Sequence, residues 1–207
     1  MSVHDATIRN QVELPVRLPD GRLATGRLVS FDGLVDGREH VAVALGGDGS
    51  GRPDDGSAGV PLVRLHSECL TGDVLGSRRC DCGPQLDDSL DLLATVGGYL
   101  LYLRQEGRGI GLYAKIDAYR LQDTGLDTFD ANLALGYPED GRDYTVAAQM
   151  LRALGVEEIR LLTNNPDKTA QLTRLGIRVT EQVPMTQHVT PANKDYLAAK
   201  AARHPIS

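Results

Sequence analysis

The chain has 207 residues, of which 41% are hydrophobic and 24% are charged, the composition of an ordinary globular protein. Its net charge of −6 disfavours a general nucleic-acid-binding surface, and its apolar runs, such as Gly98–Leu103, are too short to span a bilayer. The N-terminus lacks the pattern of a signal peptide, and the cysteines are odd in number. We therefore expect a cytoplasmic, single-domain protein with no nucleic-acid or membrane partner.

Residues 8–48 predict a small antiparallel β segment at the start of the chain. Asp-Gly and Gly-rich turns separate its three β-rich runs, which are Val12–Leu18, Arg22–Phe31 and His40–Leu45. The next segment, Gly46–Gly59, is rich in glycine, aspartate, serine and proline and is typical of a mobile loop.

From Val60 onward the pattern changes to strands that alternate with helices. Strands are predicted at Val60–Leu65, Tyr99–Arg104, Glu158–Thr163 and Ile177–Val183. Helices are predicted at Gln85–Thr95, Leu112–Asp123, Tyr144–Leu154 and Pro166–Leu175. The tail from Pro184 reads as a loop followed by the helix-prone stretch Asn193–Arg203. This alternation indicates an α/β (α+β) fold, with helices flanking a mixed β-sheet.

All three cysteines lie close together in the sequence, at Cys69, Cys80 and Cys82. Three thiolates make a zinc site one ligand short of a closed tetrahedron, and catalytic zinc sites keep such a position open for water. The alternative is three buried free thiols. Cys80 and Cys82 flank one aspartate in a polar, Gly-rich stretch, which is untypical of a core. The spacing therefore favours a metal site and points to hydrolysis.

A second cluster is the stretch Arg104-Gln-Glu-Gly-Arg-Gly-Ile-Gly-Leu112, between a predicted strand and a predicted helix. Backbone amides at such a junction can hold an anion, and its glycines allow close approach to a ligand. A plain strand-to-helix connection with solvated arginines explains these residues equally well. The stretch is not the dinucleotide fingerprint, because its third glycine comes too soon.

A third cluster is the turn Gly136-Tyr-Pro-Glu-Asp-Gly-Arg-Asp-Tyr144, which holds Asp140 and Arg142 just before a helix. Taken alone, this turn is most simply a solvated surface. Tyr119, at helical spacing from Leu112 and Ile116, could likewise be a core residue with a wet hydroxyl.

Four segments in order resemble GTP cyclohydrolase II: Arg64–Asp73, Arg79–Gly83, Arg104–Gly111 and Leu161–Pro166. The likeness covers roughly residues 60–185 and extends weakly into the N-terminal strands. It implies a zinc-dependent enzyme of riboflavin biosynthesis that converts GTP and water to 2,5-diamino-6-(5-phosphoribosylamino)pyrimidin-4(3H)-one, formate and diphosphate. It also implies Mg²⁺ with the triphosphate and a homodimer. The whole of 1–207 would form one such domain, with a β-rich part (8–48), a catalytic core (60–185) and a tail (186–207).

The resemblance also assigns roles residue by residue. It assigns zinc to Cys69, Cys80 and Cys82. It places around GTP the residues Arg64, Leu65, His66, Ser67, Glu68, Gln85, Glu106, Gly107, Arg108, Thr128, Thr163 and Lys168. Asp140 matches a proton acceptor, Arg142 a nucleophile at the α-phosphate, and Tyr119 a tyrosine implicated in catalysis.

Two alternatives within this resemblance stay open. A guanidinium stays protonated in proteins, so Arg142 could stabilise charge at the α-phosphate instead of attacking it. Some members of the family leave the formamide intact, and the tyrosine position is implicated in that difference. Because Tyr119 is present, we expect the full reaction. A non-catalytic, zinc-stabilised nucleotide-binding module is the alternative from another functional class.

Overall fold

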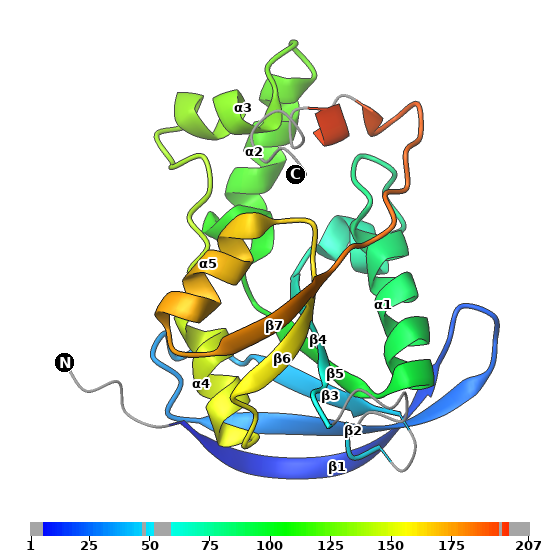
Figure 1. The fold of residues 1–207 in the computed structure, drawn as a ribbon. Helices are drawn as coiled ribbons and strands as arrows, with labels where there is room; N and C mark the ends of the chain where they lie inside the picture. The colour runs from blue at the N-terminus through cyan, green and yellow to red at the C-terminus, as the bar shows by residue number, and fades with distance from the viewer. Residues whose placement is uncertain (1–5, 47–48, 52–58, 195, 199–207) are drawn as a thin grey trace. The chain divides into compact units, whose positions relative to one another are not determined.

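The computed structural model describes residues 6–46, 49–51, 59–194 and 196–198. Its strands form one seven-stranded sheet in the order β1-β2-β3-β5-β4-β6-β7 (Figure 1). In chain order they are β1 (Thr7–Arg17), β2 (Leu23–Asp32), β3 (Val41–Leu45), β4 (Leu62–Ser67), β5 (Gly98–Leu103), β6 (Glu158–Leu162) and β7 (Arg178–Val183).

The sheet is mixed, which confirms the predicted fold class. β1, β2 and β3 pair antiparallel, as predicted for the N-terminal segment, and β3 continues the pattern by pairing antiparallel with β5. β6 pairs parallel with β4 on one side and with β7 on the other. The observed β1 begins well before the predicted Val12, because its pairing with β2 runs from Thr7 opposite Asp32 to Arg17 opposite Leu23.

Five helices lie wholly within the described ranges. They are α1 (Cys82–Val96), α2 (Leu112–Gln122), α3 (Thr128–Ala134), α4 (Thr145–Ala153) and α5 (Pro166–Arg174). All but α3 were predicted, with ends shifted by at most three residues. α3 was missed, although Asp127 caps it by accepting hydrogen bonds from the N–H groups of Phe129 and Asp130. A π-helical turn (Leu70–Val74) and a 3-10 turn (Glu106–Gly109) were missed as well.

The predicted helix boundaries around α5 have the expected physical basis. Asn165 caps the helix by accepting from the Asp167 N–H at 2.9 Å, and Pro166 occupies the first turn. Gly155 and Gly176 follow α4 and α5 with φ of 72° and 83°, the left-handed conformation that ends a helix.

The chain divides into two compact units. The sheet unit comprises Met1–His66, Asp87–Arg104 and Asp143–Met185, and the cysteine unit comprises Ser67–Leu86, Gln105–Arg142 and Thr186–Ser207. The main hydrophobic core lies in the sheet unit, where Leu65, Leu101 and Leu161 of the sheet pack with Met150 and Leu151 of α4.

Some predictions concern residues outside the described ranges. The predicted loop Gly46–Gly59 falls largely there, and so does most of the predicted helix Asn193–Arg203. The Leu197 N–H donates to the Asn193 carbonyl at 2.9 Å, so the described start of that stretch is helical. Among the helices of the described residues, none combines the length and the apolar character needed to cross a membrane.

Candidate metal centre and active site

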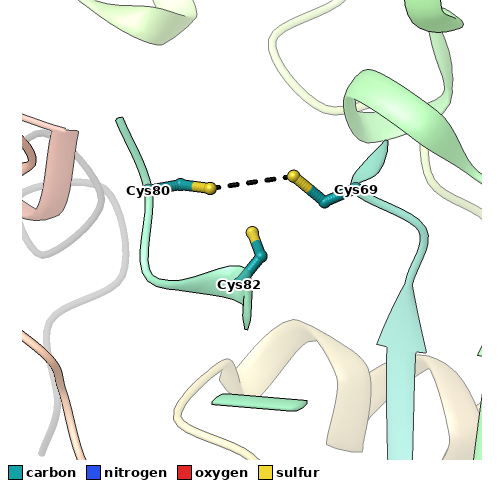
Figure 2. Close-up of side chains that lie close together, drawn as sticks. All are labelled: Cys69, Cys80 and Cys82. Atoms are coloured by element: carbon teal, nitrogen blue, oxygen red, sulfur yellow. Dashed lines mark hydrogen bonds between the residues drawn. The ribbon is translucent and has the colours of Figure 1, made fainter. Parts of the chain in front are cut away.

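The three cysteines converge in the cysteine unit. Cys69 follows β4, Cys80 lies in a loop, and Cys82 begins α1. Their sulfur atoms lie within 4.8 Å of one another, with Cys69 Sγ 3.7 Å from Cys80 Sγ, and Figure 2 shows the three thiols pointing toward a common centre. Cys69 and Cys80 are buried, and Cys82 is partly so.

The cluster fits a tetrahedral thiophilic metal. With zinc–sulfur bonds of about 2.3 Å, two thiolates at tetrahedral corners lie about 3.8 Å apart, close to the spacing of Cys69 and Cys80. Gly72 backs all three residues: a Cβ there would meet Cys80 Sγ and Cys82 Cβ at 3.1 Å and Cys69 Sγ at 3.2 Å. Gly83 has a similar constraint, because its Cβ would lie 2.6 Å from the Gly72 carbonyl oxygen. Glycine at both positions therefore lets the sulfurs approach one another.

The three thiols shift one another's pKa values. Hydrogen bonds from Cys80 and Cys82, followed by the charge of Lys115, lower the pKa of Cys69 despite its burial. The hydrogen bond with Cys69 in turn raises the pKa of Cys80 to about 11, and the same contacts with Cys69 and Cys80 raise the pKa of Cys82 well above its ordinary value. The neighbouring thiols and the Lys115 ammonium therefore favour the thiolate form of Cys69.

A buried ion pair supports Cys69 from α2. The Lys115 ammonium donates to Glu106 Oε1 at 2.7 Å, to Thr71 Oγ1 at 3.0 Å and to Cys69 Sγ at 3.1 Å. Burial lowers the pKa of Lys115, but the hydrogen bond to Glu106 and the Cys69 thiolate outweigh it, so this pKa is raised. Glu106 also accepts from the Leu70 N–H at 2.7 Å, which ties the residue after Cys69 into the same network.

Tyr119 lies one helical turn beyond Lys115 on α2. Its hydroxyl is 3.1 Å from Thr71 Oγ1, and the cations of Arg79 and Lys115 lie 4.9 and 5.6 Å from its ring centroid. Burial raises the pKa of Tyr119. The hydroxyl therefore faces the cysteine cluster, not a hydrophobic core.

The predicted glycine-rich turn adopts a conformation that few residue types tolerate. Gly107, Gly109 and Gly111 have φ of 62°, 94° and 92°. Arg108, with φ of 61°, is the one non-glycine residue with positive φ in the described part of the chain. Such a backbone is costly and is held where the surroundings over-determine it, often at functional sites.

Arg108 and Arg142 both reach Asp140. Arg142 donates from Nε to Asp140 Oδ1 at 2.8 Å and from Nη2 to Oδ2, while Arg108 Nη1 lies 3.5 Å from Oδ2. The Arg108 guanidinium also covers the Phe129 ring, 4.3 Å from its centroid. Burial raises the pKa of Asp140, but its hydrogen bonds and charge interaction with Arg142 outweigh burial and lower it. The cluster of Arg108, Asp140 and Arg142 therefore carries one ionised carboxylate and two guanidinium cations.

One pocket in the cysteine unit brings most of the predicted residues of that unit together. The predicted residues that line it are Ser67, Glu68, Cys69, Cys80, Cys82, Glu106, Gly107, Arg108, Tyr119, Thr128 and Arg142. The other two, Asp140 and Gln85, are not among the residues that line it. Asp140 is paired with Arg142, and the Gln85 amide donates to Asp81 Oδ2 at 2.5 Å.

The remaining predicted residues, Arg64, Leu65, His66, Thr163 and Lys168, belong to the sheet unit and lie near the carboxyl ends of β4 and β6. The Lys168 ammonium donates to the Leu65 carbonyl at 2.8 Å, and Arg64 Nη1 donates to the Leu162 carbonyl at 3.2 Å. His66 stacks on Tyr102, with centroids 5.5 Å apart. The carboxyl ends of adjacent parallel strands are where open α/β sheets bind ligands.

Sequence reasoning assigned no role to several residues that line the pocket. They include Arg79, Gln105, Lys115, Asn132 and Tyr196. Lys115 stands one helical turn after Gly111, so its place on α2 was predictable. Its partner Cys69 is 46 residues away, and no local pattern reports that contact.

The fold and the site together define a class: an α/β protein in which three cysteines can hold a metal beside a pocket lined with arginines. The family model of GTP cyclohydrolase II matches residues 10–184. The chain is 53% identical over 175 residues to a GTP cyclohydrolase-2 of Vibrio vulnificus, covering 84% of this chain and 85% of that protein. It is 47% identical over 197 residues to the GTP cyclohydrolase-2 of Aliivibrio fischeri strain ES114, covering 95% of each.

A longer relative shares the same region. The riboflavin biosynthesis protein RibBA of Bacillus mycoides is 46% identical over 201 residues, which are 97% of this chain and 48% of that protein. These matches, together with the residues described above, place the chain plainly: it belongs to the GTP cyclohydrolase II family.

Proposed function

We propose that the protein hydrolyses GTP to 2,5-diamino-6-(5-phosphoribosylamino)pyrimidin-4(3H)-one, formate and diphosphate, with a zinc ion, as the first committed step of riboflavin biosynthesis. The observation that carries this proposal is the three-cysteine cluster in one pocket with Arg108 and Arg142. The names of the relatives support the substrate and the pathway.

Cys69, Cys80 and Cys82 would hold the zinc ion. When bound by three protein ligands, zinc acts as a Lewis acid and generates hydroxide from water near neutral pH, the nucleophile that opening an imidazole ring and hydrolysing a formamide both need. The protein's own contribution is to keep the cluster compact through Gly72 and to hold Cys69 through Lys115 and the Leu70–Glu106 bond.

The cationic residues of the pocket suit the triphosphate. Guanidinium groups bind phosphate oxygens with fixed geometry, and Arg108 and Arg142 both line the pocket. We propose that Arg108 contacts the phosphates together with Mg²⁺. Thr163 and Lys168 of the sheet unit stay predictions from the resemblance.

For Arg142 we favour charge stabilisation over nucleophilic attack. Asp140 accepts from both its Nε and its Nη2, and such a pairing keeps the guanidinium protonated. The lowered pKa of Asp140 likewise keeps that carboxylate ionised, with the lone pairs that orient Arg142. Trapping a covalent guanylyl adduct on Arg142 would overturn this assignment.

Tyr119 is the residue to which we assign the formamide step. Its hydroxyl lies beside the cysteine cluster through Thr71, at the wall of the pocket. A phenol held there can contact the N–H of the formamide or the water that attacks its carbonyl carbon. We also propose a cytoplasmic homodimer, on the resemblance to the family.

The decisive experiment is to incubate the purified protein with GTP, Zn²⁺ and Mg²⁺ and to measure formate and diphosphate per GTP consumed. The proposal predicts both products in equal amounts. Diphosphate with a formylamino pyrimidine and no formate would assign the protein to the enzymes that stop after ring opening. Binding of GTP without either product would indicate a zinc-stabilised nucleotide-binding module.

A further inference from the structure

A chain of hydrogen bonds links the Tyr119 phenol to the cysteine cluster through Thr71. The Tyr119 hydroxyl lies 3.1 Å from Thr71 Oγ1, and Thr71 Oγ1 lies 3.7 Å from Cys69 Sγ. Thr71 lies two residues after Cys69, on the π-helical turn, so the geometry of Cys69 and that of Tyr119 are coupled through one side chain.

The Lys115 ammonium determines how the threonine hydroxyl is used. Its three contacts, with Glu106, Thr71 and Cys69, match the three N–H donors of an ammonium, which has no acceptor. Thr71 Oγ1 is therefore the acceptor in its contact with Lys115. One lone pair and one proton of Thr71 remain for Tyr119 and Cys69.

Two sets of donor directions satisfy these contacts, and one is favoured. Either Tyr119 donates to Thr71 and Thr71 donates to Cys69, or the Cys69 thiol donates to Thr71 and Thr71 donates to Tyr119. A metal-ligating cysteine is a thiolate, so it can only accept, and a hydrogen bond to an ionised acceptor is roughly twice as strong as a neutral one. A phenol is also a better hydrogen-bond donor than an aliphatic hydroxyl, because its O–H is the more acidic of the two. Tyr119 therefore donates to Thr71, and Thr71 donates to Cys69. The cations of Arg79 and Lys115, which flank the ring, offer no competing acceptor.

We propose that Thr71 is a positioning residue that holds the Tyr119 hydroxyl beside the cysteine cluster, with the phenol proton directed to Thr71 and an oxygen lone pair facing the pocket. Whatever meets Tyr119 in the pocket is then a donor, a water molecule or an N–H group. Tyr119 and Cys69 belong to the described lining of the pocket and Thr71 does not, so Thr71 acts through Tyr119. This inference rests on the proposed function and specifies how one residue of that site is held.

The hydrogen bond can be observed without turnover. Full-length, zinc-loaded protein is labelled with tyrosine carrying ¹³C at the carbon bonded to the hydroxyl, and the Tyr119 signal is assigned by its loss in Tyr119→Phe. Thr71→Val keeps the shape of the side chain and removes the hydroxyl, so the Tyr119 signal should move. Thr71→Ser keeps the hydroxyl and should leave the signal near its wild-type position.

Product ratios test the consequence. Thr71→Val should lower formate released per diphosphate about tenfold or more, as Tyr119→Phe should, and Thr71→Ser should restore the ratio. In the Tyr119→Phe background, Thr71→Val should lower the ratio no further, because its effect passes through the missing hydroxyl. The matched control is Thr95→Val, which removes an exposed hydroxyl bonded to the Asp91 carbonyl on α1 and should leave the ratio unchanged.

The outcomes separate this inference from the proposed function. A wild-type ratio and an unmoved Tyr119 signal in Thr71→Val would overturn the inference, and so would additive losses in the double variant. If Thr71→Val does not fold, Thr71→Ala serves as the second variant without the hydroxyl. Wild-type protein that released neither product would defeat the proposed function, while the Tyr119 signal would still decide whether Thr71 holds the phenol.

Discussion

Replacing Lys115 with methionine should destabilise the protein more than any change to a surface ion pair. Lys115 and Glu106 are 11% and 8% exposed at their side chains and lie 2.7 Å apart. Methionine keeps most of the aliphatic length of lysine, so the substitution removes the charge while preserving much of the packing. The Glu106 carboxylate is then left buried without its cation.

The magnitude follows from what Glu106 retains. Removing one partner of a buried ion pair costs about 3–5 kcal/mol. Glu106 keeps hydrogen bonds from the N–H groups of Leu70 and Gly107, at 2.7 and 2.9 Å, which offset part of this cost. We therefore expect a loss of about 2–3 kcal/mol in the free energy of unfolding. For a chain of this size the loss corresponds to a fall in Tm of roughly 4–12 °C.

The assay is a double-mutant cycle measured by urea unfolding at one saturating zinc concentration. The coupling energy from Lys115→Met, Glu106→Gln and the double variant should be about 2 kcal/mol. Glu106→Gln removes the carboxylate charge that Lys115→Met leaves buried without a partner. The control is the exposed pair Arg178–Glu158, at 66% and 46% side-chain exposure. Arg178→Met, Glu158→Gln and their double variant should give a coupling energy of no more than about 0.5 kcal/mol. Equal coupling for the two pairs would refute the view that the Lys115–Glu106 pair supports the site.

Three further predictions follow from the site. Cys80→Ser should abolish both zinc binding, measured by metal analysis, and formate release, while the circular dichroism stays that of a folded chain. Retained zinc would show that Cys80 is a buried free thiol and not a zinc ligand. The lowered pKa of Asp140 means that its pair with Arg142 contributes stability that is complete above the unfolded value of 3.8 and is lost as the pH falls through the lower folded value. Asp140→Asn should therefore have a lower Tm than wild type at pH 7, with a gap that narrows under strongly acidic conditions; a gap that widens there contradicts this assignment. Gly109→Ala should cost about 1–3 kcal/mol in unfolding, because Gly109 has φ of 94° and its Cβ would lie 3.0 Å from the Gly141 carbonyl oxygen; an unchanged melting curve would show that the turn can relax.

Local signals were sufficient to predict most of the fold. Apolar runs marked the strands, and Asn165, Gly155 and Gly176 marked helix ends through capping, which depends on neighbours in sequence. The early start of β1 was not predictable, because it depends on pairing with β2 across a hairpin. Helix α3 was missed, although Asp127 is an ordinary N-cap.

The candidate site was only partly visible in the sequence. Cysteine spacing indicated the metal cluster, and motif order indicated the family. The contacts of Lys115 and Thr71 that support the cluster could not be predicted, because both are ordinary residue types whose partners are far away in the chain. Thr71 meets Tyr119 across 48 positions, and Lys115 meets Thr71 across 44. Contacts of that kind arise from tertiary structure and leave no local pattern.

We propose that the three cysteines hold the metal on which the hydrolysis of GTP depends. The direct test is to remove metal with a chelator, restore zinc in steps, and measure formate and diphosphate per GTP against zinc bound per chain. Both products should rise together in proportion to zinc and level off at one zinc per chain. Full release of both products from the zinc-free protein would contradict it.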